Sequence, residues 1–236
     1  MPDLQVSKIK GVADIVFCLD VTGSMQPCID GLKRNVHRLV EALQSPMEVQ
    51  PGVVAAVKDW RAKVYGYRDI DADGPLAMIE DFPMVQTAAE LRNQLEDPRM
   101  QAAGGGDEPE SLLDALYRIA KNTPWRGEKE AHRFVVVFTD ATPKPSLHPS
   151  TVGGAGPTDL PEVLQALNAA RIKPVLYALK GPETETIQNL RPALLKACKL
   201  FTSREEALAF FSSEVQFATL VDRLAATVTA SASEVL

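Results

Sequence analysis

Side chains with hard oxygen donors follow two apolar segments that lie far apart in the sequence. The mostly apolar segment 13–19 is followed at once by three such residues, Asp20, Thr22 and Ser24. About 120 residues later a second apolar segment, 133–139, ends at Asp140. Carboxylate and hydroxyl oxygens are the ligands that hard divalent cations prefer. The two segments therefore predict a cation site at the ends of two strands.

A third, glycine-rich loop adds acidic residues. Residues 104–110 contain Asp107 and Glu110 directly before a predicted helix. In doubly wound sheets, ligands bind beyond the carboxyl ends of the strands, where the strand order reverses. Acidic groups gathered there would repel one another unless a cation neutralised them. We therefore predict that an acid of this loop joins Asp20, Thr22, Ser24 and Asp140 around a divalent ion.

Helix capping is the structural alternative for most of these residues. Thr22 or Ser24 could cap the helix that follows them, because Ser, Thr and Asp are favoured at that position. Asp107 could cap the next helix, with Glu110 in its first turn, where a negative charge is favourable. Asp140 is harder to explain in this way, because an acid that ends an apolar strand near a core needs a partner.

Short apolar runs alternate with amphipathic stretches, which is typical of parallel strands joined by crossover helices. We predict strands at 13–19, 60–68, 76–82, 133–139, 172–179 and 200–202. Helices are expected at 24–44, 87–95, 111–122 and 160–170, then up to 197, and at 204–227. The pattern indicates an α/β, Rossmann-like, doubly wound fold. Its central sheet would be mostly parallel, with one antiparallel edge strand and helices on both faces.

Composition favours a single globular domain. The 236 residues are 45% hydrophobic and 24% charged, enough for one sizeable core. We place the domain at 13–228, with an N-terminal extension at 1–12 and a flexible tail at 229–236. The three cysteines show no CxxC spacing, so we expect reduced thiols.

Charge and hydropathy exclude some classes of partner. The net charge is -6 and no cluster of Lys and Arg could follow a phosphate backbone, which argues against nucleic acid. No run approaches the roughly 18 apolar residues of a membrane span, and the N-terminus does not resemble a secretory leader. We expect a cytoplasmic protein that does not bind membranes.

Three loops together resemble the metal-ion-dependent adhesion site (MIDAS) of von Willebrand factor A (VWA) domains. The segment 20–24 is similar to that family's D-x-S/T-x-S signature, and residues 105–110 and 138–141 are similar to the second and third metal loops of integrin β subunits and related A domains. This resemblance extends over about 13–227. It implies that Mg²⁺, with Mn²⁺ as an alternative, is held by Asp20, Thr22, Ser24, Asp140 and Glu110.

The same resemblance raises a second, adjacent site. Integrin β subunits hold a Ca²⁺ ion beside the main site, and Asp69, Asp107 and Glu110 would be its counterparts here. The alternative is that Asp69 only pairs with Arg68 at the start of a turn. The other neighbouring integrin site needs two aspartates, and this chain has no acid at 26–28.

A metal held partly by hydroxyls keeps residual charge and an exchangeable position for a partner's carboxylate. The resemblance thus implies a non-enzymatic module that binds an Asp or Glu of another protein within an intracellular assembly. By analogy of fold, the partner could belong to an AAA+ ATPase or to a stress or defence complex. The alternative function is a metal-dependent hydrolase or phosphatase that uses Asp20. It is less favoured, because Thr22 stands where such a phosphatase carries its general acid.

Overall fold

The computed structural model describes residues 11–104, 108–154 and 158–234, and its middle layer is a six-stranded sheet. The strand order is β5-β4-β1-β6-β7-β8. The strands are β1 (Val12–Asp20), β4 (Asp59–Tyr67), β5 (Met78–Ile79), β6 (His132–Phe138), β7 (Ile172–Leu179) and β8 (Lys199–Phe201). All neighbours pair in parallel except β5, which is antiparallel to β4 at the edge. The predicted fold class is confirmed.

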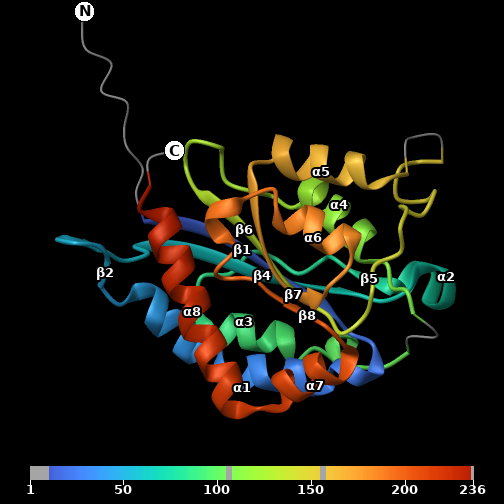
Figure 1. The fold of residues 1–236 in the computed structure, drawn as a ribbon, viewed down its shortest axis with the longest axis horizontal. Helices are drawn as coiled ribbons and strands as arrows, with labels where there is room; N and C mark the ends of the chain where they lie inside the picture. Colours follow the sequence, from blue (N-terminus) through green and yellow to red (C-terminus); the bar gives the residue numbers. More distant parts are fainter. Residues whose placement is uncertain (1–10, 105–107, 155–157, 235–236) are drawn as a thin grey trace, which may run out of the picture.

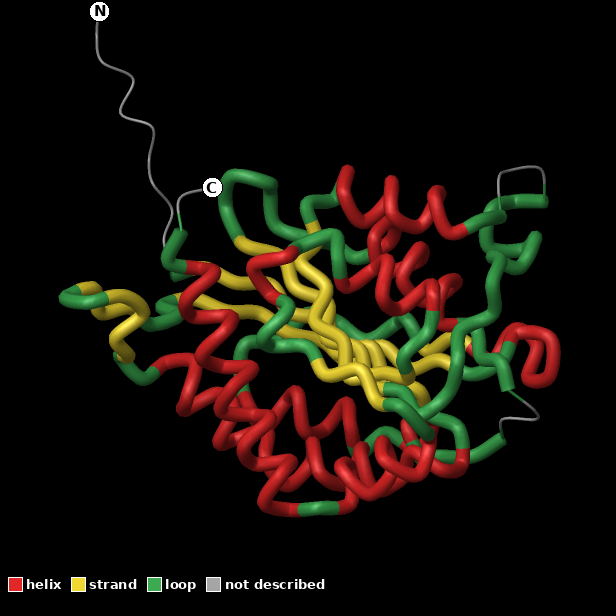
Figure 2. Tube along the Cα trace, viewed as in Figure 1, coloured by secondary structure: helices red, strands yellow, loops and turns green. Residues whose placement is uncertain are grey.

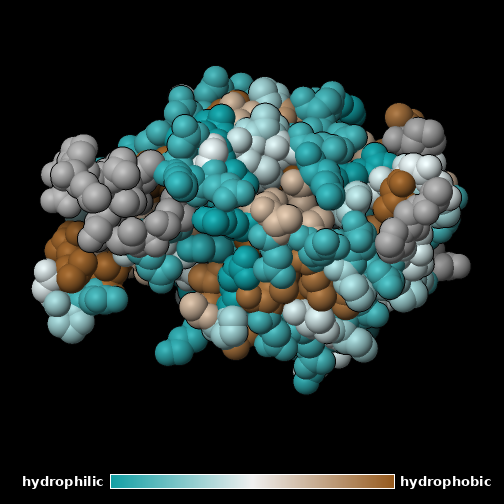
Figure 3. All heavy atoms as spheres, turned by 90° about the horizontal axis from the view of Figure 1, so that it is seen from above, coloured by the Kyte–Doolittle hydropathy of each residue, from teal (hydrophilic) through white to brown (hydrophobic). Residues whose placement is uncertain are grey.

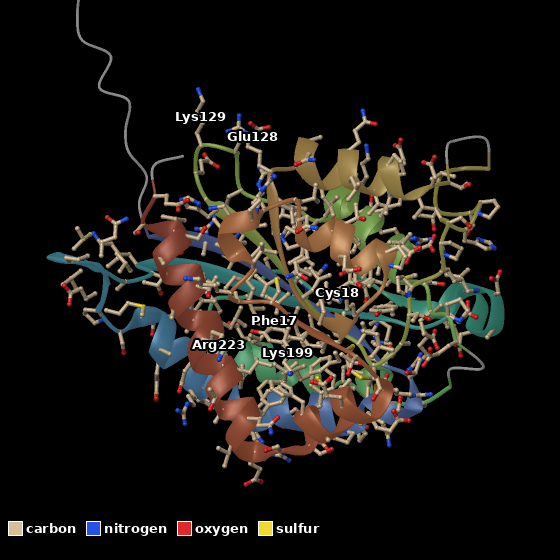
Figure 4. All side chains as sticks on the ribbon, viewed as in Figure 1. Phe17, Cys18, Glu128, Lys129, Lys199 and Arg223 are labelled. Atoms are coloured by element: carbon tan, nitrogen blue, oxygen red, sulfur yellow. The ribbon has the colours of Figure 1, made fainter. Side chains whose placement is uncertain are left out.

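Helices cover both faces of the sheet (Figures 1 and 2). One face packs against α1 (Gln26–Gln44), α3 (Ala88–Leu95), α7 (Arg204–Ser212) and α8 (Glu214–Ala232). The other packs against α4 (Leu112–Asn122), α5 (Leu160–Ala169) and α6 (Pro182–Gln188). Successive strand residues point to opposite faces. Thus Phe17 belongs to the first core and Cys18 to the second (Figure 4).

The strand order reverses at β1, which has β4 on one side and β6 on the other. From β1 the chain crosses to β4 and β5, and then returns to the opposite side of β1 to form β6, β7 and β8. Asp20 ends β1, and Thr139 and Asp140 follow β6, so the two predicted acid-bearing strand ends are neighbours at this reversal. This is the position at which doubly wound sheets bind ligands.

Short helical segments account for the first difference from the sequence prediction. The chain forms α2 (Ile70–Asp73) and the 3-10 helix η2 (Gly74–Ala77) before β5. The predicted strand at 76–82 is therefore reduced to two residues, because η2 includes its first two residues and 80–82 form no regular structure. Three further 3-10 helices are η1 (Gly23–Met25), η3 (Pro98–Met100) and η4 (Pro192–Leu194).

A projecting hairpin, formed by β2 (Met47–Gln50) and β3 (Val53–Ala55), was not predicted from the sequence. None of the residues in its two strands is buried, and Val53 and Val54 are 45% and 67% exposed. A strand without a buried face leaves only a weak apolar pattern in the sequence. Figure 3 shows a hydrophobic patch at this end of the molecule.

The predicted helix at 204–227 is two helices that meet at Ser213. Ser213 has an extended backbone, and its hydroxyl accepts a hydrogen bond from the Gln216 amide, so it ends α7 and caps α8. Helix α8 continues to Ala232, and Ser231 is only 5% exposed. Residues 229–232 thus belong to a packed helix rather than to the expected tail. Within the described ranges, no helix has the length and apolar character needed to cross a membrane.

Candidate metal centre

Asp20 forms the centre of a hydrogen-bonded cluster at the end of β1. Its side chain is fully buried. One carboxylate oxygen accepts hydrogen bonds from the Thr22 amide (2.9 Å) and hydroxyl (2.7 Å), and the other accepts one from the Thr139 hydroxyl (2.8 Å). Burial raises the pKa of Asp20 to about 6; these hydrogen bonds oppose that rise, and the charge of Asp140 adds to it. Both oxygens are held in place by the loops that follow β1 and β6.

Asp140, the second predicted acid, is also fully buried. Its Oδ2 atom accepts a hydrogen bond from Nε of Arg204 (2.9 Å). Nη2 of the same guanidinium donates to the Ser24 hydroxyl (2.9 Å), so Ser24 and Asp140 share one cationic partner. The Oδ1 atom of Asp140 has no hydrogen-bond partner within the described part of the chain. A buried carboxylate oxygen without a donor is costly unless a cation or water satisfies it.

The third loop brings Glu110 to the same edge. Its backbone bridges to the loop after β6, with the Glu110 amide donating to Thr142 O (2.9 Å) and the Lys144 amide donating to Glu110 O (2.8 Å). The Glu110 side chain is 4% exposed, and its Oε2 lacks a partner among the residues described. Burial, with the negative charges of Asp20, Asp69 and Asp73, raises the pKa of Glu110 to about 8. Asp107 lies outside the described residues.

The backbone of the first loop is tied to Gly104. The Gly23 amide donates to Gly104 O (3.3 Å), and the Ala103 amide donates to Val21 O (3.0 Å). Gly104 has a φ of +68°, and a Cβ atom there would lie 2.6 Å from Oδ1 of Asp73. Only glycine fits this position without displacing that carboxylate. The glycine-rich loop thus fixes the position of the segment that carries Thr22 and Ser24.

Asp69, from the predicted second site, follows β4 and is paired with a lysine. Its Oδ1 atom caps α2 by accepting from the Asp71 amide (2.9 Å). The Lys144 ammonium contacts both Asp69 and Asp71, and the Ser111 hydroxyl lies 3.4 Å from Asp69. A Ca²⁺ ion beside Asp69 would therefore have to displace the Lys144 ammonium.

A cavity of about 240 Å³ opens over this cluster. Its walls are Thr22, Gly23, Ser24, Gly104, Glu108, Glu110, Ala141 and Arg204. In the described ranges, no group of three or more His, Cys, Asp or Glu side chains is arranged to hold a metal. The donor set is instead a mixture of carboxylates and hydroxyls. Its hard oxygens, two of them buried and unpartnered, fit a divalent cation.

Four of the predicted ligands form two hydrogen-bonded pairs: Thr22 donates to Asp20, and Arg204 donates to both Asp140 and Ser24. Thr139 donates to Asp20. Neither Thr139 nor Arg204 was predicted as a site residue. Thr139 precedes Asp140 in the sequence, but its contact with Asp20 depends on the pairing of β1 with β6. Arg204 comes from a segment 64 residues further along the chain, and no local motif marks it.

No family model matches this chain. Two relatives of known sequence, both named von Willebrand factor A domain-containing protein 7, are similar to part of it. The mouse protein (Mus musculus) is 31% identical over 140 residues, and the human protein (Homo sapiens) is 32% identical over 137. The matches include 59% and 58% of this chain but only 13% of each relative.

Solved structures resemble most of this chain in fold. The proximal thread matrix protein 1 of the mussel byssus superposes with a TM-score of 0.54 at 16% identity, over 86% of this chain and 47% of that one. A second structure of that protein has a zinc-occupied MIDAS motif. The pilus adhesin SpaC of Lactobacillus rhamnosus GG superposes with a TM-score of 0.51 at 12% identity, over 89% of this chain and 30% of SpaC. The chain has the VWA fold, and the relatives support a VWA domain.

Proposed function

We propose that this chain is a metal-dependent interaction module. It holds a divalent cation at the reversal point of the sheet and uses that cation to bind an Asp or Glu side chain of a partner protein. Asp140, Ser24, Thr22 and Glu110 supply the oxygens that face the cation. Asp20 completes the ligand set, and its hydrogen bonds with Thr22 and Thr139 also orient the first loop. When bound, the cation supplies the positive charge that attracts the partner's carboxylate.

The unpartnered Oδ1 atom of Asp140 is the observation that carries this proposal. A capping role alone would leave that oxygen buried without compensation, which is unfavourable. Glu110 repeats the pattern, because its Oε2 is buried and unpartnered too. The zinc-occupied MIDAS of the mussel protein supports a divalent ion at the corresponding edge of this fold. We propose Mg²⁺ as the physiological ion, with Mn²⁺ as a substitute.

A non-enzymatic role agrees with the state of Asp20. The side chain is fully buried, and both oxygens accept hydrogen bonds from threonines. A nucleophilic carboxylate would need an accessible oxygen. The cavity is lined instead by two hydroxyls, two glutamates, one arginine and small residues, which suits the capture of a charged group. We propose a cytoplasmic protein assembly as the setting for this capture.

Isothermal titration of MgCl₂ and MnCl₂ into metal-stripped protein tests the first half of the proposal. Wild type should bind one equivalent at the site, and Asp140→Asn should abolish this binding. Asp222→Asn is the matched control, because Asp222 is an exposed carboxylate of α8 that pairs with Arg38. Equal binding by wild type and Asp140→Asn would refute the assignment of the site.

A pair of synthetic peptides tests the second half. The first carries a central Glu, and the second carries Gln at the same position and is otherwise identical. In the presence of Mn²⁺, the Glu peptide should bind to wild type, and chelation should release it. The Gln peptide should bind to neither wild type nor Asp140→Asn. Binding of the Glu peptide that survives chelation would contradict a metal-mediated contact.

A further inference from the structure

The Arg204 guanidinium already acts as the cation at the proposed metal centre. Its Nε and Nη2 atoms donate to Asp140 and Ser24, each at 2.9 Å, and Nη1 lies 3.7 Å from a carboxylate oxygen of Glu108. Asp140 and Ser24 are two of the proposed metal ligands. The guanidinium and a metal ion would therefore compete for the same two side chains.

Arg204 also limits access to Asp140. The arginine lines the cavity, whereas Asp140 is fully buried and is not among the lining residues. The Arg204 side chain is 45% exposed, so it can turn outward into water without unfolding the loop around it. Its outward movement would expose the carboxylate to the cavity. The arrangement thus couples the entry of a metal to the departure of the arginine.

Arg204 lies at a position in the fold where a positive charge is unfavourable. Arg204 is the first residue of α7, and a positive charge at a helix N-terminus is unfavourable. The next two residues, Glu205 and Glu206, have the acidic character that this position favours. Asp140 offsets the unfavourable charge, because it lies in the loop directly after β6 and accepts from Nε. The pairing with Asp140 thus explains why a basic residue stands at the N-terminus of α7.

We propose that Arg204 is a tethered counter-cation, which occupies Asp140 and Ser24 when the site holds no metal and must be displaced when a divalent cation binds. This inference rests on the proposed function, because it concerns the same site. The pairing lowers the metal affinity, because its two hydrogen bonds must break before the metal can use Asp140 and Ser24. Metal binding must break a charge-assisted pair whose arginine is partly exposed, so we expect roughly a 10-fold effect, equivalent to about 1.4 kcal/mol.

Metal titration of three variants tests the competition. Arg204→Gln removes the cation, and Arg204→Lys keeps the charge but loses the planar fork that joins two acceptors. Lys180→Gln controls for net charge, because Lys180 is a 57% exposed cation that follows β7 at the same sheet edge and pairs with Glu185. Arg204→Gln should bind Mg²⁺ about 10-fold more tightly than wild type, with Arg204→Lys intermediate. Lys180→Gln should stay within about twofold, because exposed charges are screened by salt.

The outcomes separate this inference from the proposed function. Equal or weaker affinity of Arg204→Gln, with metal binding in wild type, would overturn the inference and leave the function intact. An equal gain in Lys180→Gln would also overturn it, because the effect would then be one of net charge. Absence of binding in both wild type and Arg204→Gln would overturn the function, and the inference with it. Tighter binding by Arg204→Gln than by wild type, with measurable binding in both, would support both.

A spectroscopic measurement follows the arginine directly. In ¹⁵N-labelled protein, the Nε proton of Arg204 is assigned by its absence from the spectrum of Arg204→Lys. Because Nε donates to a buried carboxylate, its proton should exchange slowly with water in metal-free protein. Saturating Mg²⁺ should move the signal to the position of a solvated arginine and accelerate the exchange. A signal that is unchanged at saturation would show that the metal does not displace Arg204.

Discussion

A buried ion pair at the other end of β1 offers a quantitative test of how this fold is held together. Asp14 is fully buried, and its carboxylate accepts from Arg61 (Nη2, 2.6 Å; Nε, 3.1 Å) and from the amide and Nε of Arg126 (2.8 and 2.7 Å). These contacts join β1 to β4 and to the segment before β6. Asp14→Asn keeps the shape of the side chain but removes its charge.

The destabilisation expected for Asp14→Asn depends on the interactions that Arg61 and Arg126 lose. Removing one partner of a buried pair typically costs about 3–5 kcal/mol. The side chains of Arg61 and Arg126 are 24% and 17% exposed, so water solvates them in part. Arg61 also keeps its hydrogen bond to Pro124 O, and Arg126 keeps Asp59. We therefore expect the lower end of the range, about 3 kcal/mol.

Urea unfolding followed by circular dichroism measures this loss. Asp222→Asn is the matched control, because Asp222 forms a similar two-bond pair with Arg38, but the two side chains are 48% and 52% exposed. An exposed pair contributes at most about 1 kcal/mol. The reasoning predicts that Asp14→Asn lowers the free energy of unfolding by clearly more than Asp222→Asn does. Equal losses of unfolding free energy in the two variants would refute the claim that burial makes the Asp14 pair more stabilising than the exposed one.

The pH dependence gives a second check on the same residue. Burial alone would raise the pKa of Asp14, but the hydrogen bonds from Arg61 and Arg126 outweigh it and hold the pKa below its usual value. A carboxyl group with a lowered pKa contributes stability above its unfolded pKa of about 3.9 and loses it as the pH falls through the folded pKa. The difference between wild type and Asp14→Asn should shrink below about pH 4. A difference that widens there would contradict the assignment.

Two further predictions concern Gly31 on α1 and His132 on β6. Gly31→Ala would place a Cβ atom 2.8 Å from two ring carbons of Phe217. Overpacking of this kind typically destabilises the fold by about 1–3 kcal/mol, which should exceed the roughly 1 kcal/mol that alanine gains in helix propensity. Urea unfolding should show a net loss, and a net gain would mean that the ring moves freely. Burial and the charge of Lys173 lower the pKa of His132 to about 4. Between about pH 6.5 and 4 the unfolded chain therefore binds more protons than the folded one. The free energy of unfolding should decrease as the pH falls through this range, by at most about 3 kcal/mol. His132→Gln should flatten this part of the stability profile, and an unchanged slope there would assign it to other groups.

Features that depend on local patterns could be predicted from the sequence. The sequence indicates β1 because nearly complete burial leaves a nearly continuous apolar run, and it indicates α4 because one-sided burial leaves a periodic apolar pattern. The order of strands and helices then requires a doubly wound sheet, and Asp20 and Asp140 mark the ends of two of its strands. Local chemistry was misleading where burial was weak, as in the hairpin of β2 and β3, and where one capping residue, Ser213, divided a continuous helical pattern.

The sequence by itself determined which residues carry oxygen donors and that they stand at strand ends, because those facts depend on residue type and spacing along the chain. Only the tertiary structure decided which side chains meet there. Thr139 contacts Asp20 because β1 pairs with β6, Lys144 contacts Asp69 from the loop after β6, and Arg204 reaches Asp140 from the start of α7. The physical reason is that the fold of the backbone brings these residues together from distant parts of the chain. Proximity of this kind leaves no periodic pattern or motif in the sequence.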